Sequence, residues 1–305
     1  MENIIKVKNL RKSFADKLVV DNVSFEVKKK SLFAFLGQNG AGKTTTISML
    51  IGLLTRESGE IYYDGVADLK SFKDKIGVVF QNNIMDSLLT VEENLLTYGN
   101  LYLSSSADVK KRLPEIVELL SMEGFLKQRF STLSGGQKRK TEIARALFMS
   151  PEILFLDEPT TGLDPKTRSE FWDIIQRLKT EKGLAVFLTT HYMEETASAD
   201  NAAIINKGRI AAAGSPAELR SKYTVDKLFL TPKDEALFKK QLNEMSVPFK
   251  ITADTFEIEI KDTLYSIDLL QRLKDNIRFY ELIKGSMDDV FLNVLGDSYE
   301  AEGNL

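Results

Sequence analysis

The sequence has no cysteine and only one histidine, His191, among its 305 residues. The absence of cysteine excludes disulfide bonds, thiol catalysis and cysteine metal sites, and a single histidine excludes a metal site built from several histidines. Long apolar runs are also missing: the longest cover about five to six residues, whereas a membrane-spanning helix needs about 20. Residues 1–10 lack the apolar core of a signal peptide. We therefore expect that this chain does not cross a bilayer alone, and that another polypeptide supplies any spans.

An excess of charge of one sign is missing as well. The net charge is −3, so there is no global electrostatic argument for a nucleic-acid partner. The composition is 43% hydrophobic and 28% charged, which is ordinary for a globular protein. At about 150 residues per domain, the length predicts two domains.

The first domain has an α/β pattern. Short segments rich in β-branched and aromatic residues predict strands at 4–7, 23–27, 32–36, 60–63 and 76–80. From residue 90 to 149 the apolar residues recur at helical spacing, and residues 138–149 are expected to form one of these helices. Strand patterns return at 153–156 and 185–189, around a helix at 166–179, and are followed by a hairpin near residue 207. We expect an α/β domain over residues 1–222 with a helical subdomain at about 82–150.

The second domain, expected at residues 223–305, has a different order of elements. Strand and helix patterns alternate as β-α-β-β-α-β-α between residues 227 and 295. This order predicts a small α+β domain, and a ferredoxin-like arrangement is one that fits it. It carries no evident chemistry, so contributions to stability or to dimer contact are favoured over ligand sensing.

The stretch from Gly37 to Thr44 reads GQNGAGKT and fits the pattern G-x-x-x-x-G-K-[ST]. It follows the apolar segment 31–36 and precedes a helical segment expected at 44–54, which is the strand–loop–helix context that the motif requires. Glycines allow backbone N–H groups to surround phosphates, and the helix start adds a positive dipole end. Lys43 can reach the terminal phosphates and the Thr44 hydroxyl suits Mg²⁺. This phosphate loop, residues 37–44, predicts binding of a nucleoside triphosphate.

Two further motifs narrow the class. The signature loop, residues 133–137, reads LSGGQ at the start of a predicted helix and forms a second candidate anion site. The apolar segment 153–156 ends in Asp157 and Glu158. In phosphoryl transfer, Asp157 can hold Mg²⁺ directly or through water, and Glu158 can polarise the attacking water.

Together these motifs resemble the ATP-binding subunits of ABC transporters over about residues 3–220. Phe14 matches the aromatic residue that stacks on adenine, and Gln81 matches the glutamine of the loop that also reaches the metal. Residues 162–164, which include Asp164, match the D-loop, and His191 matches the switch histidine. Residues 89–95 and 286–292 resemble the subgroup that exports drugs, antibiotics and polysaccharides.

The resemblance implies a set of functional residues. It assigns catalysis to Lys43, Gln81, Glu158 and His191, and Mg²⁺ binding to Thr44, Gln81 and Asp157. It assigns ATP binding to two groups that face each other across two subunits: Phe14, Gly37, Asn39, Gly40, Ala41, Gly42, Lys43, Thr44 and Thr45, and Ser134, Gly135, Gly136, Gln137 and Asp164.

Structural interpretations remain open beside these functional ones. Phe14 could be a core aromatic, Gln81 an ordinary amide at a strand end, and His191 a structural histidine. Asp164 followed by Pro165 also fits a helix cap. The basic run 138–140 is expected to be a solvated or interface face.

The resemblance further implies ATP and Mg²⁺ as cofactors and a second ATPase subunit, expected to be an identical copy. It also implies a separate integral-membrane permease, which would place the chain peripherally on the cytoplasmic face of the cell membrane. The permease contact is expected within residues 82–103, with Ile84, Leu88, Leu89 and Leu95 as its apolar members. The alternatives to an exporter ATPase are an importer ATPase and a soluble ABC ATPase that acts on ribosomes or DNA.

Overall fold

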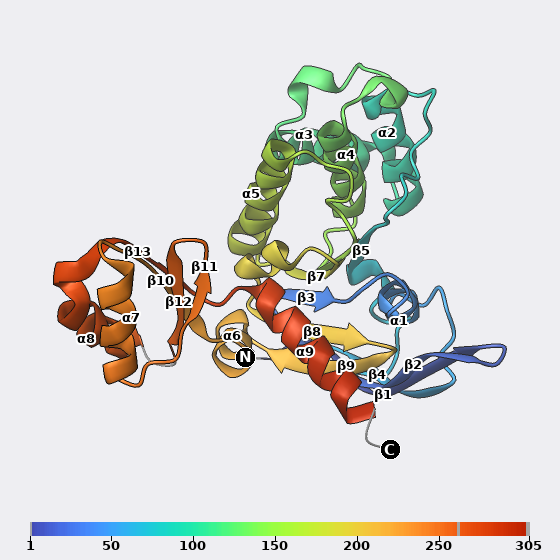
Figure 1. Ribbon diagram of the computed structural model, residues 1–305. Coiled ribbons are helices and arrows are strands. Elements are labelled where there is room, and N and C mark those ends of the chain that lie inside the picture. Colours follow the sequence, from blue (N-terminus) through green and yellow to red (C-terminus); the bar gives the residue numbers. More distant parts are fainter. Residues whose placement is uncertain (1, 261–262, 303–305) are drawn as a thin grey trace. The chain divides into compact units, whose positions relative to one another are not determined.

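The computed structural model describes residues 2–260 and 263–302, and the chain divides between Ser215 and Pro216 into two compact units (Figure 1). The first unit contains the phosphate loop, the signature loop and both carboxylates. The second contains the α+β pattern. Each unit has its own hydrophobic core.

A six-stranded sheet forms the centre of the first unit, and its strands lie in the order β5-β6-β7-β3-β8-β9. The first five strands are parallel and β9 is antiparallel to β8. The strands are β3 (Leu32–Leu36), β5 (Ile76–Val79), β6 (Ile153–Asp157), β7 (Ala185–Thr190), β8 (Asn201–Asn206) and β9 (Arg209–Gly214). Strands β3, β6 and β7 are buried along their whole length, as expected for a parallel sheet covered on both faces.

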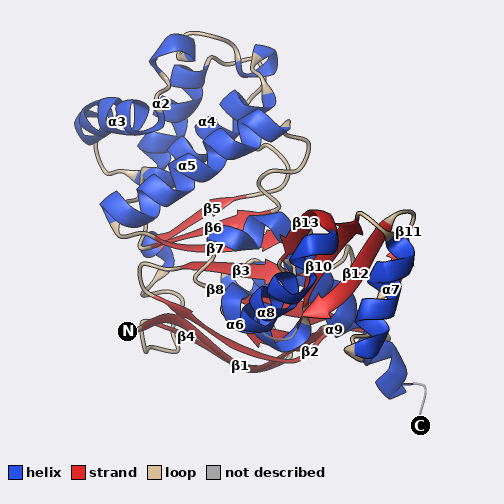
Figure 2. Cartoon of the chain, turned by 60° about the vertical axis from the view of Figure 1, so that its left-hand side comes forward, coloured by secondary structure: helices blue, strands red, loops and turns tan. Residues whose placement is uncertain are grey.

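An antiparallel sheet of β1 (Asn3–Phe14), β2 (Lys17–Lys28) and β4 (Ser58–Tyr63) packs on the central sheet, with the order β2-β1-β4. Figure 2 shows it on one side of the central sheet and the helices α2 to α5 on the other. Phe25 of β2 stacks with its ring centroid 5.3 Å from that of Phe33 and 5.7 Å from that of Phe187. These aromatic contacts join the two sheets and are part of the core.

The helix after the phosphate loop, α1 (Lys43–Leu50), is shorter than the segment 44–54 that the sequence predicted. Gly52 adopts φ +76°, in the left-handed region that favours glycine. The N–H groups of Leu53 and Leu54 donate to Ser48 O at 2.9 and 3.0 Å. These bonds close the last turn and end the helix.

The predicted helical subdomain lies between β5 and β6 and contains α2 (Val91–Tyr102), α3 (Ser106–Leu120) and α4 (Gly135–Leu147). It is followed after β6 by α5 (Pro165–Lys182). Helix α4 starts at Gly135, earlier than the predicted residue 138. A capping box explains the early start, because the Gln137 N–H donates to Ser134 Oγ and the Ser134 N–H donates to Gln137 Oε1.

The second unit has the ferredoxin-like arrangement. Its antiparallel sheet has the order β11-β12-β10-β13, which places the first and third strands of the unit side by side in the middle. The elements are α6 (Pro216–Tyr223), β10 (Asp226–Pro232), α7 (Glu235–Glu244), β11 (Lys250–Thr252), β12 (Thr255–Ile260), α8 (Thr263–Leu273), β13 (Ile277–Ile283) and α9 (Met287–Glu302).

Helix α6 belongs to this second unit, so the structure divides the chain before the predicted limit at residue 222. It packs against α9, and Asn293 Nδ2 donates to Tyr223 O at 2.7 Å. An apolar face of α9, with Val290 and Val294 buried, lies within the unit. This contact joins residues that are 70 positions apart in the chain, so the local sequence pattern does not predict it.

Candidate functional site

The predicted nucleotide groups meet at the carboxyl edge of the central sheet. The phosphate loop follows β3, Asp157 ends β6, and His191 follows β7. Strand β7 lies between β6 and β3, and all three are parallel, so their carboxyl ends share one edge. This edge is where open α/β sheets bind ligands. A cleft of about 320 Å³ there is lined by Val19 and by predicted site residues, namely Asn39, Gly40, Gly42, Lys43, Thr44, Thr45, Gln81 and Glu158.

Two glycines of the phosphate loop are required by their surroundings. Gly42 has φ +110°, and a Cβ atom there would lie 2.8 Å from Val19 O. A Cβ atom on Gly37 would lie 2.6 Å from Ile205 O. Both values are shorter than real Cβ contacts, so β2 and β8 hold the loop tightly from outside and a side chain at either position would displace it.

Lys43 is almost fully buried, and its ammonium group points back into the phosphate loop. Its Nζ donates to Gly37 O at 2.7 Å and to Gln38 O at 3.2 Å, and lies 3.1 Å from Glu158 Oε1. The side chain of Lys43 is 4% exposed and that of Glu158 is 9% exposed, so the ion pair is buried. A buried pair of this kind holds one carboxylate and one cation in fixed positions within the cleft.

Asp157 and Thr44 offer the oxygen atoms expected of a magnesium site. Thr44 Oγ1 lies 3.4 Å from Asp157 Oδ1, which also accepts a hydrogen bond from Thr189 Oγ1 at 2.5 Å. Within residues 2–260 and 263–302, no cluster of three or more His, Cys, Asp or Glu side chains could hold a metal alone. The pair therefore suits Mg²⁺, which takes one or two protein oxygens and completes its shell with water and substrate phosphates.

Glu158 is the centre of the polar contacts in the cleft. Its backbone is left-handed, with φ +45°, and its N–H donates to Thr189 O and to Thr189 Oγ1, both at 3.1 Å. This anchoring to β7 turns the carboxylate inward. Gln81 Nε2 donates to Glu158 Oε2 at 3.5 Å, and His191 Nδ1 lies 3.2 Å from the same oxygen. The strained turn orients a carboxylate toward three predicted site residues, Lys43, Gln81 and His191.

His191 has an unsatisfied ring nitrogen. Its Nδ1 is buried and, despite its short distance to Glu158, has no partner with hydrogen-bond geometry among the described residues. Orphaned polar atoms of this kind are costly unless a ligand or water pairs with them. Together with the glycine cradle, Lys43 and the Thr44–Asp157 oxygens, this nitrogen makes the residues fit a triphosphate with Mg²⁺.

Arg139 holds the loop that carries Gln81, and the sequence interpretation of this residue was wrong. Its guanidinium donates to Phe80 O at 2.7 Å and to Gln81 O at 2.8 Å, and the side chain is 6% exposed. Burial lowers the pKa of the Arg139 guanidinium. Lys138 and Lys140 are half-buried. The basic run therefore contributes one buried residue that ties α4 to the glutamine loop.

We predict that Arg139→Ala lowers the turnover of ATP about tenfold while changing the ATP affinity little. The two carbonyls lose charge-assisted hydrogen bonds worth about 1.5–3 kcal/mol each, and Gln81 loses its anchor. Steady-state kinetics and nucleotide titration separate the two effects. Lys140→Ala is the matched control, and Arg139→Lys should restore part of the turnover. A variant with wild-type turnover would contradict this positioning role.

Phe14 lies at the tip of the β1–β2 hairpin and is 47% exposed, so the core interpretation is wrong. Lys12 Nζ lies 5.5 Å from the centre of its ring. The next residue, Ala15, has φ +48°, a left-handed conformation that costs a non-glycine residue about 1–2 kcal/mol. The exposed ring is available for a planar ligand but is not part of the cleft lining, and adenine stacking stays a prediction.

The signature loop lies beside the D-loop. A Cβ atom on Gly136 would lie 2.4 Å from Thr167 Cγ2, and one on Gly135 would lie 3.0 Å from Leu163 Cδ2. Asp164 caps α5 by accepting the Thr167 N–H at 3.1 Å, and hydrogen bonds from Thr167 lower the pKa of the Asp164 carboxyl. No residue of the signature loop is among those that line the cleft at the phosphate loop.

The geometry at the sheet edge is that of a P-loop nucleotide hydrolase: it combines a glycine cradle, a buried lysine, a threonine–aspartate oxygen pair and a carboxylate held beside them. The signature loop beside the D-loop points to one class among these. The family model described as "ABC transporter" matches residues 20–161.

Relatives extend this match over nearly the whole chain. The linearmycin resistance ATP-binding protein LnrL of Bacillus subtilis is 35% identical over 264 residues, which cover 84% of each chain. The Nod factor export ATP-binding protein I of Burkholderia lata is 34% identical over 298 residues, 96% of this chain and 97% of that protein. The solved structure of cbiO1 from Clostridium perfringens, part of an ABC transporter complex, matches with a TM-score of 0.68 at 26% identity, covering 80% of this chain and 96% of that one.

The chain therefore belongs to the ATP-binding subunits of ABC transporters, and the resemblance predicted from its motifs is confirmed. It is an ABC-type ATPase that uses ATP and Mg²⁺. Subunits of this family form dimers and work with membrane permeases. One bacterial cassette, similar with a TM-score of 0.63 at 27% identity over 69% of this chain and 98% of that one, was solved as a dimer. None of the helices in the described part of this chain has the length and apolar character to cross a membrane.

Proposed function

We propose that two copies of this chain enclose two ATP molecules and hydrolyse them to drive export through a separate permease. The proposal of a dimer rests on the observation that the signature loop does not line the cleft at the phosphate loop. Lys43 and Glu158 line the cleft at the phosphate loop, whereas no residue of the capped, glycine-rich start of α4 is in that lining. A second copy would supply its signature loop to the first copy's phosphate loop and exclude solvent from the triphosphate.

In this site the residues have separate roles. Lys43 and the phosphate-loop N–H groups bind and orient the terminal phosphates, and Phe14 stacks on the base. Glu158 polarises the attacking water and accepts its proton at a carboxylate oxygen. The His191 ring, which lies beside Glu158, donates a hydrogen bond to the terminal phosphate. Gln81 lies in the loop that follows β5, so its contact with the nucleotide site couples nucleotide binding to the position of that loop. Bound Mg²⁺, held through Thr44 and Asp157, would neutralise developing charge on the phosphates.

The export direction is supported by two relatives, one named for linearmycin resistance and one for Nod factor export. An importer remains the alternative within the family. In either case we place the chain peripherally on the cytoplasmic face of the cell membrane, bound to an integral-membrane permease, because a subunit that consumes ATP must face the compartment that holds it.

A groove next to the glutamine loop is suited to the permease. It has a volume of about 360 Å³, and its lining includes Leu53, Phe80 and Tyr102 together with Met149, which follows α4; Lys73, Asp74 and Arg145 are its charged members. Phe80 directly precedes Gln81, so an occupant of the groove contacts the loop that senses the nucleotide. An amphipathic helix fits such an apolar groove. This lining differs from the expected contact residues: from the segment 82–103 it contains Tyr102 but none of the four apolar residues named from the sequence. Of those four, Leu95 is fully buried in the helical subdomain and cannot face a partner, whereas Leu88 is 74% exposed.

We predict that Leu53→Asp weakens binding of the permease while leaving basal ATP hydrolysis unchanged. Leu53 lies on the lip of the groove and is 67% exposed, so a charge there costs little folding stability but opposes an apolar helix. Val66→Asp is the matched control, since Val66 is 54% exposed, lies outside residues 82–103 and does not line the groove. The measurement is the amount of membrane protein that co-purifies from detergent-solubilised membranes.

The same purification tests the proposed function. A stoichiometric integral-membrane partner, retained by the Val66 variant and lost by the Leu53 variant, supports the transport role. Co-purifying RNA or ribosomal protein instead would support the soluble alternative. Equal retention by both variants would place the permease contact elsewhere on the chain.

A further inference from the structure

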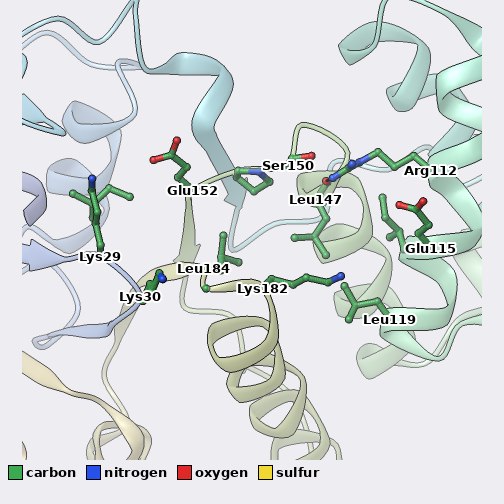
Figure 3. A pocket seen from close by; sticks show the side chains of 14 residues that line it. Lys29, Lys30, Arg112, Glu115, Leu119, Leu147, Ser150, Glu152, Lys182 and Leu184 are labelled. Atoms are coloured by element: carbon green, nitrogen blue, oxygen red, sulfur yellow. Dashed lines mark hydrogen bonds between the residues drawn. The ribbon is translucent and has the colours of Figure 1, made fainter. Parts of the chain in front are cut away.

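A second cavity lies at the opposite edge of the central sheet from the nucleotide site. It has a volume of about 520 Å³ and is bounded by α3, by the turn before β3, and by the segments that lead into β6 and β7 (Figure 3). Lys30 precedes β3, whereas Gly37 of the phosphate loop follows it. Five residues of strand separate the two edges by about 16 Å, so this cavity and the nucleotide site share no lining residue.

The cavity has an apolar floor of the kind that binds the body of a small molecule. Ile4, Ile116, Leu147 and Leu184 are each less than 10% exposed, and Leu119 is half-buried at the rim. These side chains come from β1, α3, α4 and the segment before β7. The floor is therefore shared between the helical subdomain and the sheet.

The rim carries cations that lack counter-charges. Lys30 and Lys182 form no ion pair within the described residues, and Figure 3 shows the Lys182 side chain extending toward α3. Arg112 of α3 donates from Nη2 to Leu147 O at 3.0 Å, but its buried Nε has no hydrogen-bond partner among the described residues. An incompletely satisfied guanidinium at an apolar cavity favours an anion.

The remaining charged groups of the lining leave this excess of positive charge in place. Lys29 is paired with Glu2 at 3.0 Å and with Asp64 at 2.6 Å, and Glu152 is paired with Lys75 at 2.7 Å. Glu115 is the carboxylate of the lining that has no ion pair in the described part of the chain. It opposes three cations, Lys30, Arg112 and Lys182, so the local balance is positive although the whole chain is negative.

We propose that this cavity binds an amphipathic anion. The acidic head group of the ligand would lie at Lys30, Arg112 and Lys182, and its apolar body would lie on the floor that includes Ile116 and Leu184. Such a ligand would contact α3 and the sheet at once and would clamp the helical subdomain against the core. Binding to the folded state alone also raises the unfolding temperature, and the increase grows with the logarithm of the ligand concentration above its dissociation constant.

The probe is 8-anilinonaphthalene-1-sulfonate, an aromatic sulfonate that fluoresces in apolar sites, titrated into the full chain with saturating ADP and Mg²⁺ to occupy the nucleotide site. The double variant Lys30→Gln/Lys182→Gln should bind it about tenfold more weakly. The control is Lys110→Gln/Lys111→Gln, which removes the same charge from exposed positions of α3 outside the cavity. N-phenyl-1-naphthylamine, which lacks the sulfonate, should bind both double variants equally.

Leu119→Asp is the second variant, because a carboxylate at the rim repels the head group without emptying the core. It should also weaken the sulfonate about tenfold, and unfolding curves for all variants check that they are folded. Equal sulfonate affinity in both double variants, or an unchanged affinity in Leu119→Asp, would overturn the proposal.

Competition identifies the source of the natural ligand. Displacement of the sulfonate by laurate, a free amphiphile, would assign a soluble metabolite or fatty acid. Displacement by vesicles of dioleoylphosphatidylglycerol but not by laurate would assign a membrane lipid. Failure of both anions to displace it would overturn the proposal that an acidic amphiphile binds here.

Discussion

Glu158→Gln should bind ATP and turn it over about 100- to 10,000-fold more slowly, the range expected when a general base is removed. The amide preserves the shape of the side chain but cannot accept the proton of the attacking water. The substitution also removes the carboxylate that lies 3.1 Å from Lys43 Nζ, so the lysine charge is left entirely for the phosphates. Affinity for ATP should therefore be unchanged or higher.

An ATP-bound dimer of this variant should accumulate, because the step that separates the subunits no longer occurs. Size-exclusion chromatography with light scattering should give twice the monomer mass with ATP and the monomer mass with ADP. Glu118→Gln, at an exposed position of α3, is the control and should behave as wild type. Wild-type turnover by Glu158→Gln would contradict the role of this carboxylate. Slow turnover without a dimer would contradict the proposed pairing of subunits.

Lys43→Ala should lower the affinity for ATP about ten- to a hundredfold, because a charge-assisted contact to phosphate contributes about 1.5–3 kcal/mol. The affinity measured by calorimetry tests this directly. Lys111→Ala, on the surface of α3, is the control for the loss of one positive charge.

Folding must be separated from binding in this experiment. Removing Lys43 leaves Glu158 buried without its cation, and breaking a buried pair costs about 3–5 kcal/mol. The double variant Lys43→Ala/Glu158→Gln removes both charges and should unfold at a higher temperature than Lys43→Ala while binding ATP equally weakly. ATP affinity at the wild-type level in the double variant would show that Lys43 does not bind phosphate.

The local chemistry of the site was predictable from the sequence, because it depends on short motifs with fixed spacing. A phosphate loop needs Gly37, Lys43 and Thr44 in one strand–loop–helix segment, and such a segment folds the same way in many proteins. The meeting of Asp157 and His191 with this loop was also predictable, since adjacent parallel strands end at one edge. The order of strands and helices in the second unit followed from their alternating periods.

Features that depend on contacts between distant segments were not predictable. The basic run 138–140 contains three similar residues, and only the packing of α4 against the glutamine loop selects Arg139 for burial. The start of α4 differs from the predicted one because two glycines disfavour a helix, whereas the Ser134 cap compensates for them. The cationic cavity was missed because its lining comes from segments more than 150 residues apart, such as Lys30 and Lys182.

Complementation between two inactive chains is the most direct test of an ATPase site shared by two subunits. Lys43→Ala damages the phosphate loop and Ser134→Arg blocks the signature loop, so neither chain alone should hydrolyse ATP. In an equal mixture, half of the dimers contain one chain of each kind and have one intact site of two. We expect about a quarter of the wild-type ATPase rate for independent sites in such a symmetric dimer. A mixture no more active than the two variants measured separately would contradict the shared site.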